Sequence, residues 1–194
     1  MTPMKSSVLL FTVAISVWQT PMFAEDWDLQ ALMSELGARN SGTAHFVEKK
    51  YVAILDSPIE QSGTLAYAPG RLEKITLSPR LERMTIDGDS LTIERGASKK
   101  TRHLRLSRYP ILWGFVEGLR AALTGDLNTL QNFYEIELHG SPGDWEMVLV
   151  PSQRRMRAVV RLVSIRGDRG HIEIIEMVEA TGDRSVTHVT EDAS

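Results

Sequence analysis

The residues with the widest chemical repertoire in this chain are its five histidines, and their spacing defines no site. The five are His45, His103, His139, His171 and His188, and no two of them stand at the spacing of metal ligands. A zinc site would need three or four donors converging from separate segments, and the chain has no cysteine to supply one. The sequence therefore predicts no metal site, and solvated histidines on the surface of a sheet explain all five.

Catalytic groups have no local signature either. No serine lies in a Gly-x-Ser-x-Gly elbow, and no glycine-rich phosphate loop is present. Asp87 and Asp89 flank Gly88 as in a fragment of a calcium loop, but the remaining ligands are absent and a hairpin turn explains the residues. We therefore expect a protein without catalytic residues or cofactors. A hydrolase whose serine, histidine and acid converge from distant segments stays open.

Two clusters of basic residues remain among the chemically distinctive features. The first contains Lys99, Lys100, Arg102, Arg105 and Arg108, and the second contains Arg154, Arg155, Arg157 and Arg161. Neither cluster has interleaved aromatics, and the net charge of the chain is −3, so we expect no nucleic-acid partner. A docking surface for an acidic partner or for anionic head groups is one interpretation. An ordinary solvated strand face is the other.

The segment from Pro110 to Leu130 predicts a helix around which the rest of the chain is organised. Its apolar residues recur every three or four positions, which places them on one face: Leu112, Phe115, Val116, Leu119, Ala122 and Leu123. Pro110 suits a first turn, Gly125-Asp126 ends the helix, and Asn128 is the expected cap of a short second helix with Leu130 and Phe133. Gly114 and Gly118 either loosen the long helix or permit close packing.

Most of the remaining chain alternates between apolar and polar residues, with Gly, Pro and Asp at the breaks. Trp27 to Leu36 predicts an amphipathic helix ended by Gly37, and roughly ten strands follow, of which Met156 to Ile165 is expected to be the longest. The economical arrangement is a mainly β, α+β domain in which one curved antiparallel sheet covers the apolar helix.

The first 24 residues have the layout of a secretory signal peptide. Lys5 precedes a short apolar run, and Pro21 and Ala24 stand before acidic Glu25-Asp26. A membrane anchor is the alternative. We expect cleavage after Ala24, a mature domain over residues 25–194 and a net charge of −4, because only Lys5 is lost among the charges. The mature protein is expected to be soluble, because no cysteine is present to carry the acyl chains of a lipoprotein.

The order of these parts resembles the LolA-type periplasmic lipoprotein carriers. The matching segments span nearly the whole mature chain: His45-Phe46-Val47-Glu48-Lys49, Ser62-Gly63-Thr64-Leu65-Ala66-Tyr67, Met84-Thr85-Ile86-Asp87-Gly88-Asp89-Ser90-Leu91 and Trp145-Glu146-Met147-Val148-Leu149-Val150-Pro151. Pro69-Gly70-Arg71-Leu72-Glu73-Lys74 is similar to a divergent LolA-related branch.

The resemblance implies an incomplete β-barrel closed by a helical lid, with an apolar concavity that shelters acyl chains. The protein would then be a non-catalytic, monomeric carrier in the periplasm, between an inner-membrane donor transporter and an outer-membrane acceptor. Its cargo would be a lipoprotein, a glycolipid or a polyene lipid. The residues expected at the cavity and lid are Leu112, Trp113, Phe115, Val116, Leu119, Phe46, Tyr67 and Met84.

One departure from the family concerns the lid. The familiar carriers have an Arg-Pro pair whose arginine helps to hold the lid, whereas here Pro69 is followed by Arg71 two residues later. We expect Arg71 at the rim of the concavity, in contact with the lid or with a cargo head group. The alternative function is a non-catalytic envelope assembly factor that docks a partner protein through its sheet and has no lipid cavity.

Overall fold

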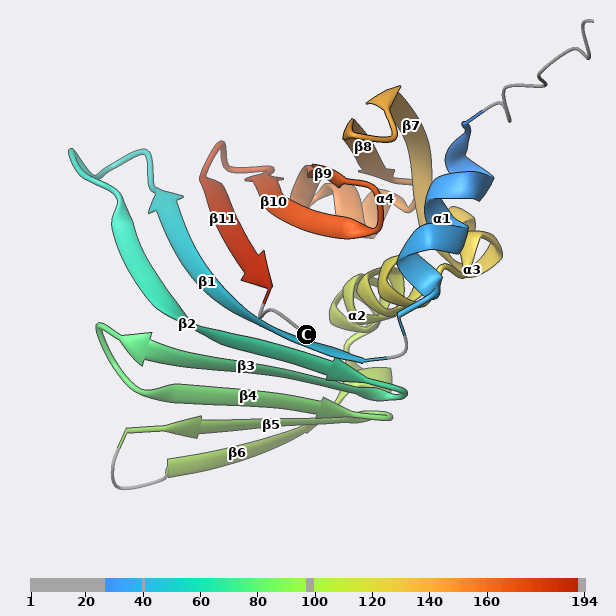
Figure 1. The fold of residues 1–194 in the computed structure, drawn as a ribbon. Coiled ribbons are helices and arrows are strands. Elements are labelled where there is room, and N and C mark those ends of the chain that lie inside the picture. The colour runs from blue at the N-terminus through green and yellow to red at the C-terminus, as the bar shows by residue number, and fades with distance from the viewer. Residues whose placement is uncertain (1–26, 40, 97–99, 192–194) are drawn as a thin grey trace, which may run out of the picture.

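The computed structural model describes residues 27–39, 41–96 and 100–191, so the predicted signal peptide and Lys99 lie outside the described residues. In this part of the chain, eleven strands form one antiparallel sheet with the order β6-β5-β4-β3-β2-β1-β11-β10-β9-β8-β7. The sheet curves, and helices lie inside the curve and at one end of it (Figure 1). The predicted fold class is confirmed.

The elements follow the chain in a simple order. The strands that precede the long helix are β1 (Gly42–Tyr51), β2 (Ile59–Ala68), β3 (Arg71–Ser78), β4 (Glu82–Asp87), β5 (Ser90–Arg95) and β6 (Lys100–Arg105). The strands that follow it are β7 (Tyr134–Ser141), β8 (Asp144–Pro151), β9 (Val160–Asp168), β10 (His171–Glu179) and β11 (Arg184–Glu191). The helices are α1 (Leu29–Gly37), the short 3-10 helix η1 (Leu106–Arg108), α2 (Pro110–Thr124), α3 (Leu127–Phe133) and α4 (Arg154–Arg157).

The sheet remains open because its two edge strands do not pair with each other. β6 and β7 stand at opposite ends of the strand order. The chain passes from one edge to the other through η1, α2 and α3, and α2 runs along the inside of the curve (Figure 1). A sheet of this size would otherwise leave its inner apolar face in water. The helices cover part of that face, which a closed barrel would cover with its own opposite wall.

Local signals set the limits of α2 as the sequence predicts. Pro110 occupies the first turn, and Gly125 ends the helix in the left-handed conformation with φ 70°. The cap of α3 differs from the prediction: Asp126, not Asn128, accepts a hydrogen bond from Thr129 N–H. Asp126 also accepts from the Thr129 hydroxyl, and these hydrogen bonds hold the pKa of its carboxyl below the ordinary value.

Two apolar clusters pack on opposite sides of α2. The larger joins α1, α2, α3 and β7–β9 around fully buried residues such as Leu32, Leu130, Trp145 and Met147. The smaller joins Ile86, Leu91, Leu106 and Val116 at the β4–β5 end of the sheet. The helix is therefore covered on two sides, as expected of an apolar helix inside a sheet.

The two glycines inside α2 permit close packing, which is one of the two roles left open by the sequence. A Cβ at Gly118 would stand 2.4 Å from Cε2 of Tyr134, and one at Gly114 would stand 2.8 Å from the sulfur of Met156. Tyr134 is buried against this helix, and burial raises its pKa to about 12.

The prediction that the longest strand runs from Met156 to Ile165 is wrong in its start and in its rank, because β1 and β2 have ten residues each and β9 has nine. The chain first makes the helical turn α4, and β9 begins only at Val160. Met156 is buried, and Arg157 donates to the carbonyl oxygens of Pro151 and Ser152 at 3.0 and 2.7 Å, which folds the segment back on itself. Among the described residues, no helix is long and apolar enough to cross a membrane.

Candidate binding cavity

A cavity of about 910 Å³ lies between the concave face of the sheet and the helices α1 and α2. Its walls are mainly aliphatic, and residues from both halves of the sheet contribute to them. The aliphatic lining from the strands comprises Ala44, Leu65, Ala66, Leu72, Met84, Ile86, Ile172, Ile175 and Val189. The helices add Leu36, Leu119 and Leu123.

Strand alternation explains which side chains reach the cavity. Thr187, Val189 and Glu191 of β11 line it, whereas the intervening His188 is exposed and points to the other face of the sheet. On α2, Leu119 and Leu123 stand four residues apart and continue the stripe of Leu112 and Val116, which is buried in the smaller apolar cluster. The same helix face thus packs against the core at one end and lines a cavity at the other.

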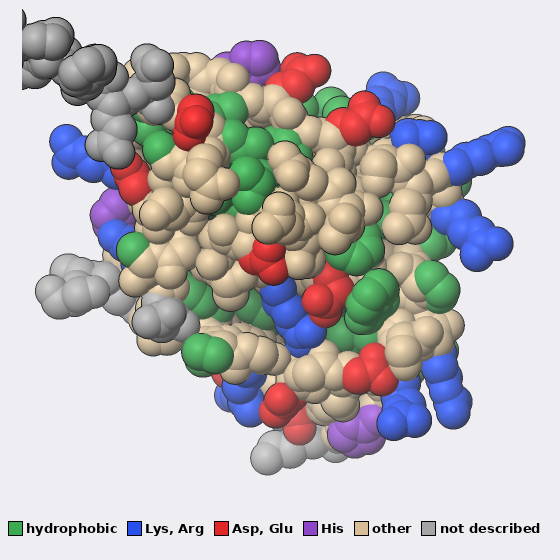
Figure 2. Space-filling view, turned by 90° about the vertical axis from the view of Figure 1, so that its right-hand side faces the viewer, with side chains coloured by type: hydrophobic (Ala, Val, Ile, Leu, Met, Phe, Trp, Pro, Cys, Tyr) green, Lys and Arg blue, Asp and Glu red, His purple; other side chains and the backbone are tan. Residues whose placement is uncertain are grey.

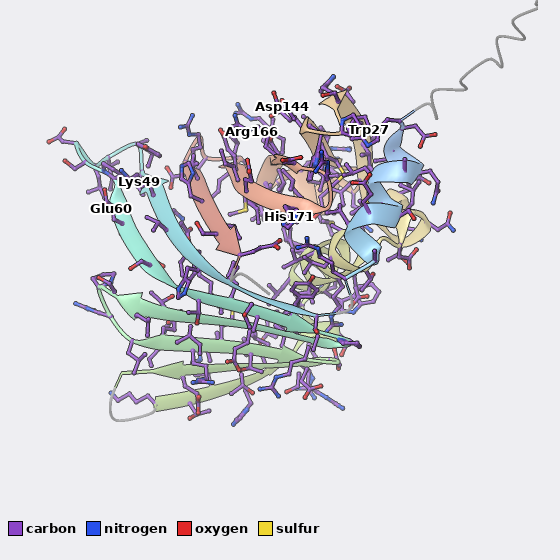
Figure 3. All side chains as sticks on the ribbon, viewed as in Figure 1. Trp27, Lys49, Glu60, Asp144, Arg166 and His171 are labelled. Atoms are coloured by element: carbon purple, nitrogen blue, oxygen red, sulfur yellow. The ribbon has the colours of Figure 1, made fainter. Side chains whose placement is uncertain are left out.

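One end of the cavity is polar. Arg39, in the loop after α1, forms an ion pair with Glu191 at the end of β11. The Arg39 guanidinium also donates to Nε2 of His171 at 2.6 Å, and Nδ1 of His171 lies 2.9 Å from Glu191 Oε2. Since a guanidinium only donates, Nε2 must accept and the proton lies on Nδ1. Figure 3 shows His171 on β10, at the end of the strand that faces α1.

Tyr67 stands beside this polar cluster and lines the same cavity. Burial, and then the negative charge of Glu191, raise the pKa of the Tyr67 phenol, while Arg39 acts in the opposite direction. The phenol is therefore protonated at neutral pH. Arg39, Tyr67 and Glu191 together place donors and acceptors next to an otherwise aliphatic wall.

A second charged pair lies further along the concave face. Lys74 Nζ lies 2.6 Å from Glu48 Oε2 and 4.6 Å from the ring centroid of Phe46. Lys74 lines the cavity, and Phe46 is 1% exposed beneath it. Phe46 is therefore part of the floor under Lys74 and does not itself line the cavity.

The hairpin turns at the end of the cavity are joined to α2 by Arg120. Its Nη2 donates to the carbonyl oxygen of Gly88 at 2.7 Å and to that of Gly70 at 3.3 Å, while Nη1 donates to Glu117 at 2.8 Å. The Gly88 N–H donates to the same Gly70 carbonyl at 3.1 Å, so both turns and the helix meet at one point. We call this set of contacts the Arg120 bridge. A smaller cavity of about 230 Å³ adjoins it.

The structure places the predicted site residues in three groups. Leu119, Tyr67 and Met84 line the cavity. Leu112, Phe115, Val116 and Phe46 pack in or against the apolar core. Trp113 is 41% exposed and contacts the edge of Phe133, with ring centroids 5.7 Å apart, so it lies outside the cavity lining.

Arg71 lies beside the expected turn but not against the helix. Its guanidinium is half exposed and pairs with Glu73 at 3.2 Å and with Asp87 at 3.9 Å. Arg120, which sequence reasoning missed, makes the contact between helix and turns. Its signal was available: Arg120 and Glu117 are the only charged residues in the fifteen-residue helix α2.

No group in the described chain combines three or more His, Cys, Asp or Glu side chains close enough to hold a metal ion. The polar cluster at the cavity consists of an arginine, a glutamate, a histidine and a tyrosine. Such a set can bind hydroxyl, amide or anionic groups of a ligand by hydrogen bonds.

Comparison with known proteins points to one family. The family described as "Outer membrane lipoprotein carrier protein LolA-like" matches residues 22–194. No curated protein matches the chain. A LolA superfamily protein from Nitrosomonas europaea shares 10% identity with a TM-score of 0.45, over 84% of this chain and 91% of that one.

Two further solved structures are similar at comparable distance. A putative outer membrane lipoprotein-sorting protein domain from Vibrio parahaemolyticus shares 11% identity with a TM-score of 0.42, over 82% of this chain and 89% of that one. MucB, solved in complex with MucA(peri), shares 14% identity with a TM-score of 0.34, over 86% of this chain and 56% of that one.

Proposed function

Since the chain belongs to the LolA-like family of outer membrane lipoprotein carrier proteins, we propose that it carries an acylated amphiphile through the periplasm and catalyses no reaction. The acyl chains lie in the cavity between the curved sheet and α2. An inner-membrane transporter donates the cargo, and an outer-membrane acceptor receives it. The cargo is a lipoprotein, a glycolipid or a polyene lipid.

The observation that carries this proposal is the cavity of about 910 Å³ with its aliphatic walls. Ligand pockets in proteins have volumes of roughly 300–1,000 Å³, so this one has room for a lipid-sized ligand. Each methylene group removed from water contributes about 0.8 kcal/mol, and an acyl chain of ordinary length therefore binds with useful affinity.

The polar end of the cavity supports a cargo with a hydrogen-bonding head group. Arg39 supplies a guanidinium, Glu191 a carboxylate and Tyr67 a phenol, and all three line the same cavity as the aliphatic residues. Burying a polar head group without partners is costly, so an amphiphile gains by placing its head here and its chains against Leu65, Met84 and similar residues.

Release of the cargo requires α2 to move away from the sheet. Leu119 contacts the cargo directly in this proposal, while Leu112, Phe115 and Val116 hold the other turns of the helix in the core. The Arg120 bridge holds the helix to the hairpin turns and opens when cargo enters or leaves. Arg71, paired with Glu73 and Asp87, supports those turns from the outer face.

The proposal is tested with two tryptophan substitutions on β11. One fills the cavity, and the other, on the opposite face of the strand, is the control. Thr187→Trp places an indole in the cavity, and His188→Trp places the same group on the opposite face of β11. Binding is followed by titration with a fluorescent fatty-acyl probe.

Weakened binding in Thr187→Trp, with wild-type binding in His188→Trp, supports the carrier function. If the wild-type protein does not bind the probe, or if both variants bind it as the wild type does, the carrier proposal fails. The better supported function is then that of an envelope assembly factor that docks a partner through its sheet.

A further inference from the structure

A surface remote from the cavity combines arginines with exposed aromatic side chains. We call it the α4 face and define it by Arg154, Arg155, Arg161, Val159, Trp113 and Tyr109. All six are exposed. None of its three arginines forms an ion pair with any described residue, in contrast to Arg83, Arg95 and Arg184 on the rest of the sheet.

The charge of this surface is one-sided in the sequence as well. Residues 147–167 contain five arginines and no Asp or Glu. α4 lies behind β10 in the view of Figure 1, and the turned view of Figure 2 shows lysine and arginine side chains projecting from that side, with few acidic ones among them. The protein has a net negative charge, so the positive charge of this surface is a local exception. Because salt screens charges, this surface attracts an anionic partner only within about 10 Å.

Packing fixes α4 and the start of α2 next to each other. The buried Met156 lies against Gly114, the residue after Trp113. Trp113 packs on the edge of Phe133, whose carbonyl accepts from Ser152 N–H at 2.9 Å. Arg157 donates to the carbonyl of the same Ser152 at 2.7 Å. The arginines and the indole therefore flank one braced turn and cannot separate without unfolding it.

Two aromatic side chains and one aliphatic side chain on this surface remain exposed although the core lies close by. Trp113 is 41% exposed, Tyr109 49% and Val159 44%. The N-terminus of α2, where Tyr109 makes no side-chain capping hydrogen bond, adds positive potential beside Tyr109 and Arg108. A layer of anionic head groups over hydrocarbon offers phosphates to the arginines and an interface that suits indole and phenol rings.

We propose that the α4 face docks the protein on a lipid bilayer that contains anionic phospholipid. A bilayer fits better than an acidic protein, because head-group phosphates suit the unpaired arginines and the interface beneath them suits the exposed indole and phenol rings. In a fluid interface each side chain finds its own depth. This surface is separate from the cavity, so docking does not depend on the proposed carrier function.

Vesicle binding tests the proposal directly. The purified protein is sedimented with vesicles of mixed phosphatidylglycerol and phosphatidylcholine, and with vesicles of phosphatidylcholine alone. Binding is expected only to the mixed vesicles, and it weakens as salt is added. Because each arginine near an anionic surface contributes about 1 kcal/mol, Arg154→Gln/Arg155→Gln lowers partitioning roughly 30-fold, equivalent to about 2 kcal/mol.

Three control variants separate docking at this face from a general effect of charge and from binding through the cavity. Arg83→Gln/Arg95→Gln removes the same charge from the sheet and is expected to leave partitioning nearly unchanged. The emission of Trp113, taken as the difference between wild type and Trp113→Phe, shifts to shorter wavelength on mixed vesicles. Thr187→Trp, with its filled cavity, binds the vesicles as the wild type does.

The proposal is overturned if the two double variants lose binding equally, because the effect is then one of net charge. It is also overturned if the protein ignores mixed vesicles but binds polyglutamate, since an acidic protein is then the partner. Loss of vesicle binding in Thr187→Trp would assign the binding to the cavity and also refute docking through the α4 face.

Discussion

Arg120 is the residue at which the proposed opening of the cavity can be tested most sharply. It is the single side chain of α2 that donates to both hairpin turns, at 2.7 Å to Gly88 and 3.3 Å to Gly70. Removing it should allow the helix to leave the turns more often. The variant is Arg120→Leu combined with Glu117→Gln, because Glu117 would otherwise lose its partner at 2.8 Å.

The size of the effect follows from these contacts. A hydrogen bond to a charged group contributes about 1.5–3 kcal/mol. The Arg120 side chain is 20% exposed and its second bond is long, so we take about 2 kcal/mol in total for the bridge. If the bridge breaks when the cavity opens, the open state gains roughly 30-fold in population.

Stopped-flow uptake of a fluorescent fatty-acyl probe measures this population through the rate of entry. The double variant is expected to take up the probe up to roughly 30 times faster than the wild type. Arg71→Leu is the matched control, since this arginine lies at the same turn but does not contact α2, and its uptake rate should remain that of the wild type.

A gating role for the bridge is refuted if the double variant takes up the probe at the wild-type rate while its free energy of unfolding falls by about 2 kcal/mol. The bridge would then stabilise the fold without controlling entry. A faster rate in Arg71→Leu, without a change in the double variant, would return the gating role to the arginine expected from the sequence.

Three further expectations follow from the packing. Leu119→Ala should weaken acyl-probe binding with little loss of stability. Leu130→Ala removes a side chain that is 0% exposed and should lower the free energy of unfolding, measured in urea, by about 2–5 kcal/mol. Equal losses of stability in the two variants would contradict the assignment of Leu119 to the cavity. Gly118→Ala should destabilise the protein by about 1–3 kcal/mol because a Cβ would stand 2.4 Å from Tyr134, and a gain in stability would show that the helix is loosely held. The folded-state pKa of Tyr134 is raised from 10.0 to about 12, so the unfolded chain loses this proton first as the pH rises. The free energy of unfolding should therefore fall by about 1.4 kcal/mol per pH unit between pH 10 and 12. Urea titrations at high pH should show this slope in the wild type and its loss in Tyr134→Phe.

The parts of the fold that were predictable from the sequence depend on neighbours along the chain. Pro110 and Gly125 limit α2 because their backbone preferences act locally, and the strands follow from alternation between turns. The sequence predicts Asn128 as the cap of α3, but Asp126 is equally suited by residue type and stands directly after the left-handed Gly125. Local preference alone could not separate the two.

The errors at α4 and Arg120 have a different origin, because tertiary contacts decide both. Met156 is drawn into the core against Gly114, 42 positions earlier in the chain, and this contact converts the start of an expected strand into a helical turn. Arg120 reaches Gly70 and Gly88 across separations of 50 and 32 residues. Periodicity indicates that α2 has an apolar face, but it does not indicate which turns of that face meet the core and which meet the cavity.

The central claim is that an acylated amphiphile occupies the cavity. Mass spectrometry of organic extracts, made from protein purified out of its native periplasm, tests it most directly. We expect one class of acyl-chain amphiphile in extracts of the wild type and of His188→Trp, and its loss from Thr187→Trp. The absence of any such lipid from the wild type, or equal amounts in all three proteins, would contradict the carrier function.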